Sequence, residues 1–225
     1  MYQNRQDTTV SVAVKLRDEA DAYAVFWTTT PWTVPTNFAI VVGADIDYVE
    51  VRPTEGKFAG KKFYIGKPLL GSYTKELGEN YEVVRELKGA EMAGWRYYPV
   101  FPYFASDSAL AEGGTPGPNA FTIFTADYVD TAEGTGLVHQ APYGEDDMNT
   151  LNAHEIRSVD VLDAGCKFTS DCPDYEGLYV FDANLPILRN LRAGDGPLAQ
   201  MPEDQRALLF QEKSYVHSYP HCWRC

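Results

Sequence analysis

The feature that most limits the fold is a run near the amino end in which apolar and polar or small residues alternate. Residues 9–16 read Thr-Val-Ser-Val-Ala-Val-Lys-Leu, so that every second side chain from Val10 onward is a larger apolar one. A period of two predicts a β-strand with one face in a core. Similar short runs follow, and we expect further strands at 23–28, 38–42, 47–51, 81–87, 120–128, 136–140 and 159–162.

Helices are expected only around these strands. The helical patterns cover 69–77, 144–154, 184–191 and 203–212, whereas residues 105–119 are small, polar and rich in Gly and Pro, as in a surface loop. A parallel βαβ array does not fit, because it needs a helix between successive strands and the first half lacks them. The predicted fold class is mixed α/β and β-rich, with a closed six-stranded β-barrel and peripheral helices.

Charge and hydropathy restrict the function. The 225 residues are 44% hydrophobic, enough for a sizeable core in one large domain. The chain carries 19 basic and 32 acidic residues, a net charge of −13, which argues against a freestanding nucleic-acid binder. No run approaches the roughly 20 apolar residues of a membrane span, and the first residues lack a signal-peptide core. We therefore expect a cytoplasmic protein with no membrane contact.

The four cysteines suggest a metal site that is incomplete in this sequence. Cys222 and Cys225 form a C-x-x-C pair, which is half of a zinc knuckle, because tetrahedral zinc needs four ligands. Cys166 and Cys172 have poor spacing for the other half. Two interpretations stay open: the partner pair lies elsewhere in a longer protein, or these are free thiols.

The first segment with chemical potential is 28–37, Thr-Thr-Thr-Pro-Trp-Thr-Val-Pro-Thr-Asn. Three threonines, Thr28, Thr29 and Thr30, end a hydrophobic strand, and two prolines then break regular pairing. Proline lacks an amide proton and fixes its own φ, so hydroxyls and backbone donors are left unpaired here. The alternative interpretation is an ordinary β-branched strand end followed by a turn.

The second segment is 134–147, Gly-Thr-Gly-Leu-Val-His-Gln-Ala-Pro-Tyr-Gly-Glu-Asp-Asp. A glycine-led strand carries His139 and runs into an acidic helix start with Asp146 and Asp147. Taken alone, such a histidine is more often structural, and the aspartates could simply cap the helix. The sequence contains no G-x-S-x-G, P-loop or H-E-x-x-H motif.

Together, these segments resemble the editing domain that is inserted in the synthetic core of the isoleucyl-tRNA synthetase family. The matching patterns are T-T-T-P-W-T-x-P-x-N at 28–37 and G-T-G-x-V-H-x-A-P followed by G-x-D-D at 134–147, and the resemblance covers nearly the whole chain. Residues 219–225 resemble the segment that re-enters the core, and the C-x-x-C pair fits a family zinc site whose other half precedes the insertion. Thr30 and Trp32 favour isoleucine over the valyl and leucyl relatives, which carry T-T-R-P.

The resemblance implies post-transfer editing, the hydrolysis of mischarged Val-tRNA(Ile), with valyl-adenylate as a second candidate substrate. The full-length protein would be an ATP-dependent ligase. Hydrophobic pockets discriminate one methylene by only about 10–200-fold, and isoleucyl-tRNA synthetases are themselves the usual example, so a second, hydrolytic site is needed. The alternatives are a valyl-type editing specificity, a non-catalytic aminoacyl- or nucleotide-binding barrel, and a zinc-organised interaction domain.

The resemblance also implies residue roles. Asp147 would pair with the α-ammonium of the aminoacyl group, with Asp146 as the alternative, because this stretch is one residue shorter than is usual. The three threonines and Asn37 would bind the terminal adenosine and orient the attacking water, and His139 would exclude isoleucine. The implied catalytic residues are Thr28, Thr29, Thr30 and Asp147, and the implied substrate-binding residues are Trp32, Asn37, His139, Gln140 and Asp146.

No cofactor or metal is expected for editing, and zinc is expected only in the full-length protein. Residues 1–225 would form a single editing domain with its core at about 8–200, and 201–225 would begin the return to the synthetic core. The expected partners are the 3′ end of tRNA(Ile) carrying valine, valyl-adenylate and the synthetic core of the same chain.

Overall fold

The structure is a computed structural model that describes residues 2–220, with side chains described for residues 8–214. Nine strands form one sheet: β1 (Tyr2–Lys15), β2 (Ala22–Thr28), β3 (Ala39–Val42), β4 (Asp47–Pro53), β5 (Lys62–Gly66), β6 (Tyr81–Lys88), β7 (Thr122–Thr125), β8 (Leu137–Gln140) and β9 (Leu208–Pro220). The α-helices are α1 (Thr74–Leu77), α2 (Gly89–Met92), α3 (Glu145–Ala153) and α4 (Val180–Ala193). Short 3₁₀ helices connect them, of which η1 (Pro31–Thr36) and η2 (Lys67–Tyr73) are the longest.

The predicted alternation in β1 separates two hydrophobic cores. Val10, Val12 and Val14 face the larger core, and Ala13 faces the smaller one. β2 does the same one strand further on, because Tyr23 and Val25 belong to the smaller core while the residues on either side of them belong to the larger. A strand with a core on each face is buried along its length, which explains its nearly continuous apolar sequence.

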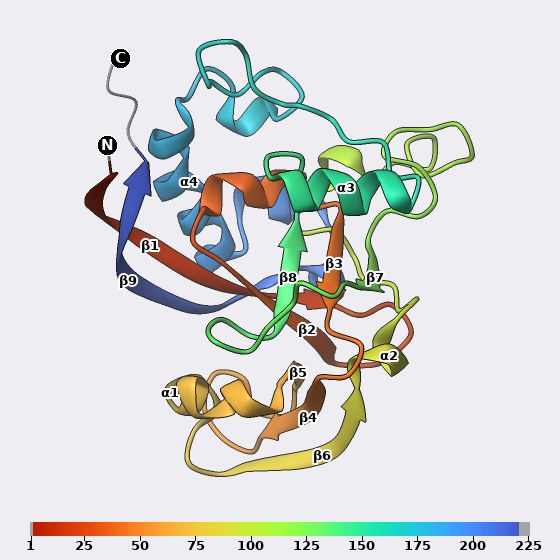
Figure 1. Cartoon of the computed structure of the whole chain (residues 1–225), viewed down its shortest axis with the longest axis vertical. Coiled ribbons are helices and arrows are strands. Elements are labelled where there is room, and N and C mark those ends of the chain that lie inside the picture. Colours follow the sequence, from red (N-terminus) through yellow and green to blue (C-terminus); the bar gives the residue numbers. More distant parts are fainter. Residues whose placement is uncertain (1, 221–225) are drawn as a thin grey trace.

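The prediction of a closed six-stranded barrel is wrong. The sheet is open and curled, with strand order β6-β4-β5-β2-β8-β3-β7, and β1 joins β2 to β9 off this path (Figure 1). β2 pairs antiparallel with β1 and parallel with β5 and β8, and β3 is parallel to β7. The end strands β6 and β7 do not pair with each other.

The sheet stays open because the segment beside β7 does not form a strand. Arg96 makes one isolated bridge to Thr122 of β7, and Tyr97 makes another to Leu16 after β1. Gly94 before this segment has a φ of +86°, and Pro99 after it has no amide proton to donate to a ladder. Residues 95–97 therefore span the gap with single bridges.

Several predicted elements are confirmed and two are wrong. α3 and α4 correspond to the helices predicted at 144–154 and 184–191, and the chain leaves the 69–77 helix at Gly78, whose φ is +79°. The helix predicted at 203–212 is wrong, because after one 3₁₀ turn the chain enters β9, which pairs with β1. The strand predicted at 159–162 is reduced to one bridge, between Leu162 and Phe168.

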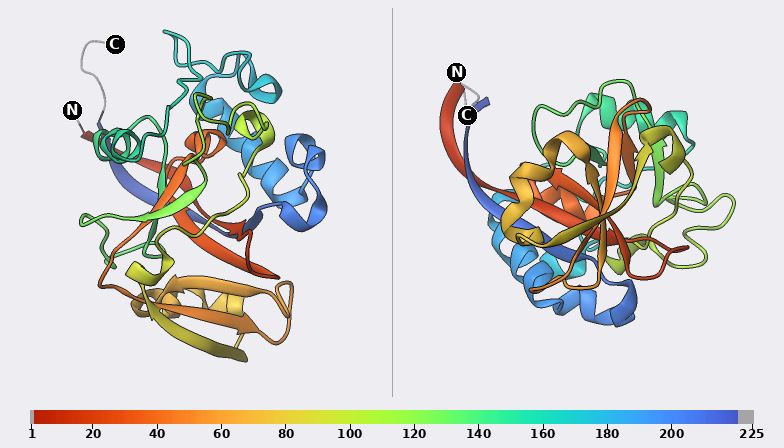
Figure 2. Two further views of the ribbon diagram at one scale, coloured as in Figure 1. Left: turned by 90° about the vertical axis from the view of Figure 1, so that its right-hand side faces the viewer. Right: turned by 90° about the horizontal axis from the view of Figure 1, so that it is seen from below.

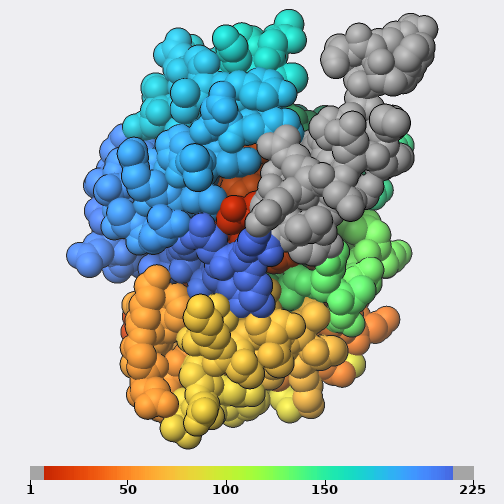
Figure 3. All heavy atoms as spheres, turned by 90° about the vertical axis from the view of Figure 1, so that its left-hand side faces the viewer, coloured from red at the N-terminus to blue at the C-terminus, as the bar shows by residue number. Residues whose placement is uncertain are grey.

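At the bottom of Figure 1, β4, β5, β6 and α1 form a lobe over the smaller core, here called the lower lobe. β9 runs between this lobe and α4, as the space-filling view shows (Figure 3), and its Phe210 packs against Phe58 and Phe63. The beginning of β1 and the end of β9 project together from the rest of the molecule as a two-stranded ribbon (Figure 2). Within residues 2–220, no helix combines the length and apolarity that a membrane span requires.

Candidate functional site

The two segments singled out in the sequence meet at one cavity. β2 and β8 lie side by side where Trp27 pairs with Val138, and the chain beyond each strand forms a wall of a cavity of about 550 Å³. Six of the nine predicted site residues line it, namely Thr28, Thr29, Thr30, Trp32, His139 and Asp147. Asn37, Gln140 and Asp146 do not line it.

The threonine wall forms where the chain leaves the sheet. Thr28 ends β2 and Pro31 begins η1, so the three threonines occupy the turn between them. The Thr28 Oγ1 accepts the amide proton of Thr30 at 3.1 Å and lies 3.1 Å from the Thr30 Oγ1. Within the part of the chain that the structure describes, the Thr29 hydroxyl has no hydrogen-bond partner, so it is available to a ligand or water.

Trp32 adds an unused donor to the same cavity. Its indole Nε1 is buried and has no hydrogen-bond partner among the described residues. The indole packs against the Tyr143 ring, with centroids 4.8 Å apart. Because a buried polar atom is normally hydrogen-bonded, an unpaired one beside a cavity indicates a position for a ligand or ordered water.

Asp147 is one of three carboxylates that line this cavity. It is the third residue of α3, where the helix dipole favours an anion, and its Oδ2 lies against Gly144, where an added Cβ would be 2.4 Å away. Burial, followed by the nearby charge of Asp146, raises the pKa of Asp147 to about 6. Among the described residues no cation pairs with it. Asp146 is exposed and points outside the cavity lining.

His139 lies deeper, with only 8% of its surface exposed, and its ring stacks on Phe26 at 5.1 Å. The Asn37 amide nitrogen lies 2.8 Å from its Nδ1, and the Thr33 Oγ1 lies 2.8 Å from its Nε2. Burial lowers the pKa of His139 to about 3, so the ring is neutral at any physiological pH. The predicted residue Asn37 therefore contacts the cavity only through this histidine.

Gln140 also sits behind the cavity wall. It is fully buried, and its Oε1 accepts a 2.8 Å hydrogen bond from the hydroxyl of Tyr128, which does line the cavity. Sequence reasoning missed Tyr128, because an aromatic residue at the end of a strand carries no motif. It also missed Thr33, although this residue lies inside the threonine segment.

The charges around the cavity have one sign. Asp130, Glu133 and Asp147 line it, and no lysine or arginine within the described residues does. Such a surface favours a cationic group and disfavours a phosphate in contact with the wall. Within residues 2–220, no cluster of three or more His, Cys, Asp or Glu is placed to hold a metal ion.

The structure describes only two of the four cysteines for which predictions were made. Cys222 and Cys225, the predicted half of a zinc knuckle, lie outside the described residues. Cys166 is an exposed free thiol, and Cys172 is a buried one.

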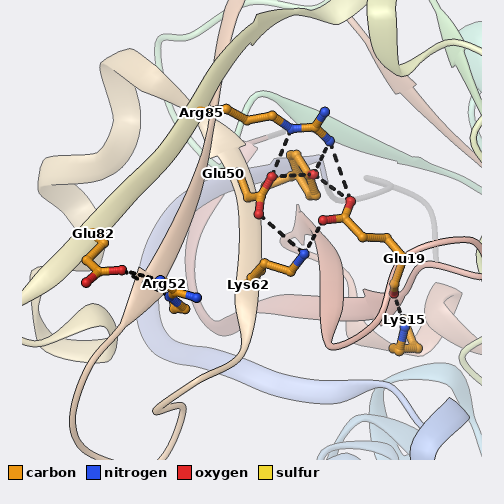
Figure 4. A network of polar contacts seen from close by, with 8 residues as sticks. Lys15, Glu19, Glu50, Arg52, Lys62, Glu82 and Arg85 are labelled. Atoms are coloured by element: carbon orange, nitrogen blue, oxygen red, sulfur yellow. Dashed lines mark hydrogen bonds and ion pairs between the residues drawn. The ribbon is translucent and has the colours of Figure 1, made fainter.

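A second cavity, of about 520 Å³, lies at the opposite end of β2 and is surrounded by a network of charges (Figure 4). Glu50 is almost fully buried, and its Oε2 accepts a 2.8 Å hydrogen bond from the Arg85 Nε. Lys62 pairs with both Glu50 and Glu19, and Arg85 also reaches Glu19. These charges satisfy one another, so the network explains how the lower lobe is held and does not require a ligand.

Solved structures share this architecture. GlLeuRS-CP1 superposes with a TM-score of 0.58 over 92% of this chain and 99% of its own, at 9% identity. The editing domain of the P. falciparum cytosolic leucyl-tRNA synthetase gives a TM-score of 0.54 over 83% of this chain and 96% of its own, at 8% identity. No family model matches the chain. The fold is thus that of aminoacyl-tRNA synthetase editing domains.

Sequence comparison gives the family. The chain is 83% identical over 225 residues to the isoleucine–tRNA ligase of Bifidobacterium longum, and 40% identical over 232 aligned residues to that of Mycobacterium tuberculosis. It spans 20% of the length of each of these relatives, and all of this chain is covered. The chain therefore belongs to the isoleucine–tRNA ligase family, in which it corresponds to the editing domain.

Proposed function

We propose that this domain hydrolyses the ester of valine misattached to tRNA(Ile). The single observation that carries the proposal is the half-buried Asp147 carboxylate, which lines the cavity and has no cationic partner among the described residues. Every aminoacyl ester carries an α-ammonium, and this group would supply the missing charge. Because an added positive charge favours the ionised form, substrate binding would lower the pKa of Asp147 from about 6.

The reaction needs only an oriented water. Its oxygen attacks the ester carbonyl, the bond from the acyl carbon to the ribose oxygen breaks, and that oxygen takes up a proton, which releases valine and tRNA(Ile). The Thr29 hydroxyl and the Trp32 indole N–H are two cavity groups available to hold the water or the developing oxyanion. An activated ester requires no protein nucleophile.

Specificity is assigned to the neutral wall of the cavity. We propose that His139 limits the size of the side-chain pocket, so that valine enters and isoleucine does not. The His139 ring is held on three sides, by Phe26, Asn37 and Thr33, and so cannot move aside for an extra methylene. His139→Ala in the full-length protein should therefore allow hydrolysis of Ile-tRNA(Ile), measured as loss of the charged tRNA.

The partners follow from the same proposal. Only the single-stranded 3′ end of tRNA(Ile) would enter this cavity, while other parts of the full-length protein would hold the rest of the tRNA, which suits the net charge of −13. Valyl-adenylate is the weaker candidate substrate, because its phosphate is bonded directly to the reacting acyl group and would lie among carboxylates. The zinc knuckle with Cys222 and Cys225, and the return to a synthetic core from residue 201, are likewise proposals for the full-length protein.

The decisive experiment compares Asp147→Ala with Asp146→Ala in the full-length protein. Removing one side of a desolvated charged pair costs about 3–5 kcal/mol, or roughly two to three and a half decades of rate. Asp147→Ala should lose Val-tRNA(Ile) deacylation on that scale with isoleucine activation near normal, and the exposed Asp146→Ala should lose much less.

Other results would count against the proposal in distinct ways. Exchanged phenotypes would make Asp146 the anchor. No effect from either variant would remove the ammonium anchor from this segment. Tight binding of a valyl-adenosine analogue without any turnover by the unaltered protein would favour the non-catalytic binding barrel.

A further inference from the structure

A chain of buried polar groups lies behind the threonine wall. The Tyr97 hydroxyl donates to the Asn37 Oδ1 at 2.7 Å, and the Asn37 amide nitrogen lies 2.8 Å from the His139 Nδ1. From the His139 Nε2 the contacts continue to the Thr33 Oγ1 at 2.8 Å, which donates to the Thr30 carbonyl at 2.9 Å. Tyr97, at the start of these contacts, is fully buried and does not line the candidate site, whereas Thr30, at their end, does.

The Ala39 carbonyl and the Tyr97 hydroxyl together set the direction of the bonds in this chain. A carbonyl can only accept, so the Asn37 amide nitrogen faces Ala39, and the amide oxygen accepts the proton of the Tyr97 hydroxyl. The Asn37 amide nitrogen then faces two acceptors, the His139 Nδ1 and the carbonyl of Ala39 at 3.1 Å. A reversed amide would present its oxygen to the Ala39 carbonyl and its nitrogen to the Tyr97 hydroxyl.

The orientation of Asn37 fixes the form of the histidine. Since the Nδ1 accepts a hydrogen bond, the proton of neutral His139 is on the Nε2, which donates to the Thr33 Oγ1. The Thr33 hydroxyl proton is then free to bind the Thr30 carbonyl, next to the amide of Thr33, which binds the same carbonyl at 3.0 Å. With the proton on the Nδ1 instead, the Nε2 would compete with Thr30 for the Thr33 hydroxyl proton.

We propose that Tyr97 is a positioning residue for the candidate site: through Asn37 it helps to keep the proton of the neutral His139 ring on the Nε2, and through Thr33 it fixes Thr30. The inference rests on the proposed function. A neutral ring is what an ammonium-binding cavity needs, because a protonated His139 in its wall would repel the substrate. Tyr97 itself never touches the substrate.

The chain offers a matched control for the loss of a buried tyrosine hydroxyl. Tyr175 is 1% exposed, and its hydroxyl donates to the Asn190 Oδ1 at 3.1 Å, the same kind of bond at a place that lines no part of the cavity. Tyr97→Phe and Tyr175→Phe in the full-length protein should therefore lower the melting temperature by similar amounts. Only Tyr97→Phe should lower kcat for Val-tRNA(Ile) deacylation, by about tenfold and with little change in KM.

Coupling provides the second kinetic measurement. If Tyr97 acts through Asn37, adding Tyr97→Phe to Asn37→Ala should reduce kcat no further than Asn37→Ala alone. An equal loss of kcat in the Tyr175→Phe control, a normal kcat in Tyr97→Phe, or additive losses in the double variant would each overturn the inference.

A crystal structure of the Tyr97→Phe protein tests the same inference without any assay of activity. The expected change is a displaced Asn37 amide, with loss of its 2.8 Å contact with the His139 Nδ1. Unchanged positions of Asn37, His139 and Thr33 would overturn the positioning role. If the unaltered protein fails to hydrolyse Val-tRNA(Ile), the proposed function fails, while this structure still decides whether Tyr97 orients the histidine.

Discussion

At the scale of single residues, burial disfavours the charged form of both Asp147 and His139, but their charges at neutral pH differ. Burial raises the pKa of Asp147 to about 6, still low enough for an anion at neutral pH. It lowers the pKa of His139 to about 3, so that this ring carries no charge. One cavity thereby combines an anion with a neutral imidazole, which is the pairing that a cationic substrate requires.

The first prediction concerns the free energy of unfolding, which the ionised Asp147 carboxylate lowers. Its pKa rises on folding from 3.8 to about 6, so the ionised form is disfavoured in the folded state. The penalty is fully present above pH 6 and absent below pH 3.8. Asp147→Asn should therefore raise the free energy of unfolding of this chain by about 1–2 kcal/mol at pH 7.5, after allowance for solvent screening, with no gain near pH 4. Urea unfolding at both pH values measures this.

The exposed neighbour provides the control for that measurement. Asp146 lies in the same helical turn but is exposed, so Asp146→Asn should give no comparable gain in the free energy of unfolding at pH 7.5. A gain for Asp147→Asn that persists unchanged at pH 4 would show that ionisation of this carboxyl is not its source.

The second prediction concerns the pH dependence of deacylation. Ionised Asp147 is the form that binds the ammonium, so kcat/KM for Val-tRNA(Ile) should fall about tenfold per unit below a pH of about 6. Between that pH and about 7 it should be level, because His139 is already neutral there, and it should fall again as the substrate α-ammonium loses its proton near its usual pKa of roughly 7.7–8.0. A rate profile of the full-length protein between pH 5 and 8 measures this. An acid limb that is retained in Asp147→Asn would assign the titration to another group.

At the scale of elements, the first turn of α3 is shaped to hold its carboxylate in the cavity. Gly144 precedes the helix in extended backbone, with a φ of −116°, so its conformation does not require glycine. The space around this residue favours glycine, because an added Cβ would be 2.4 Å from the Asp147 Oδ2. The glycine in G-x-D-D is thus explained by the side chain three residues later.

The third prediction follows from this contact. Gly144→Ala should push the Asp147 carboxylate aside and lower Val-tRNA(Ile) deacylation at least tenfold, while the fold is kept, because the clashing atom is the end of a side chain. Gly71→Ala is the matched control, since an added Cβ there meets nothing within 4 Å. The measurement is deacylation by the full-length variants beside their isoleucine activation. Equal rates for the two variants would contradict the proposed contact.

At the scale of the whole molecule, sequence reasoning succeeded where a local pattern decides the structure. The period of two predicted β1, and the acidic turn after Gly144 predicted α3. It failed where distant pairing decides. Residues 203–212 are rich in helix formers, yet Leu208 and Leu209 pair with β1, and tertiary contacts outweigh propensity. The closed barrel failed for a similar reason, since only the packed chain shows that residues 95–97 make single bridges.

The candidate site divides along the same line. Of the nine residues that the motifs singled out, six line the cavity, among them Asp147 but not Asp146. They gave no sign of Tyr97 or Tyr128, whose contributions depend on hydrogen bonds to residues more than ten positions away. Contributions of this kind become visible only when the segments are packed together.

The strand β2, with a core on each face, governs how the molecule can open. Both faces of this strand are buried, so we expect its amides to exchange with solvent only when the whole domain unfolds. In hydrogen–deuterium exchange the amides of Val25 and Phe26 should be among the slowest, at the free energy of global unfolding, whereas Val84, 45% exposed at a bulge of the edge strand β6, should exchange early. Fast exchange at Val25 would mean that the lower lobe opens alone. Otherwise the lobe and the threonine wall belong to a single cooperative unit, and damage to one is felt as lost protection in the other.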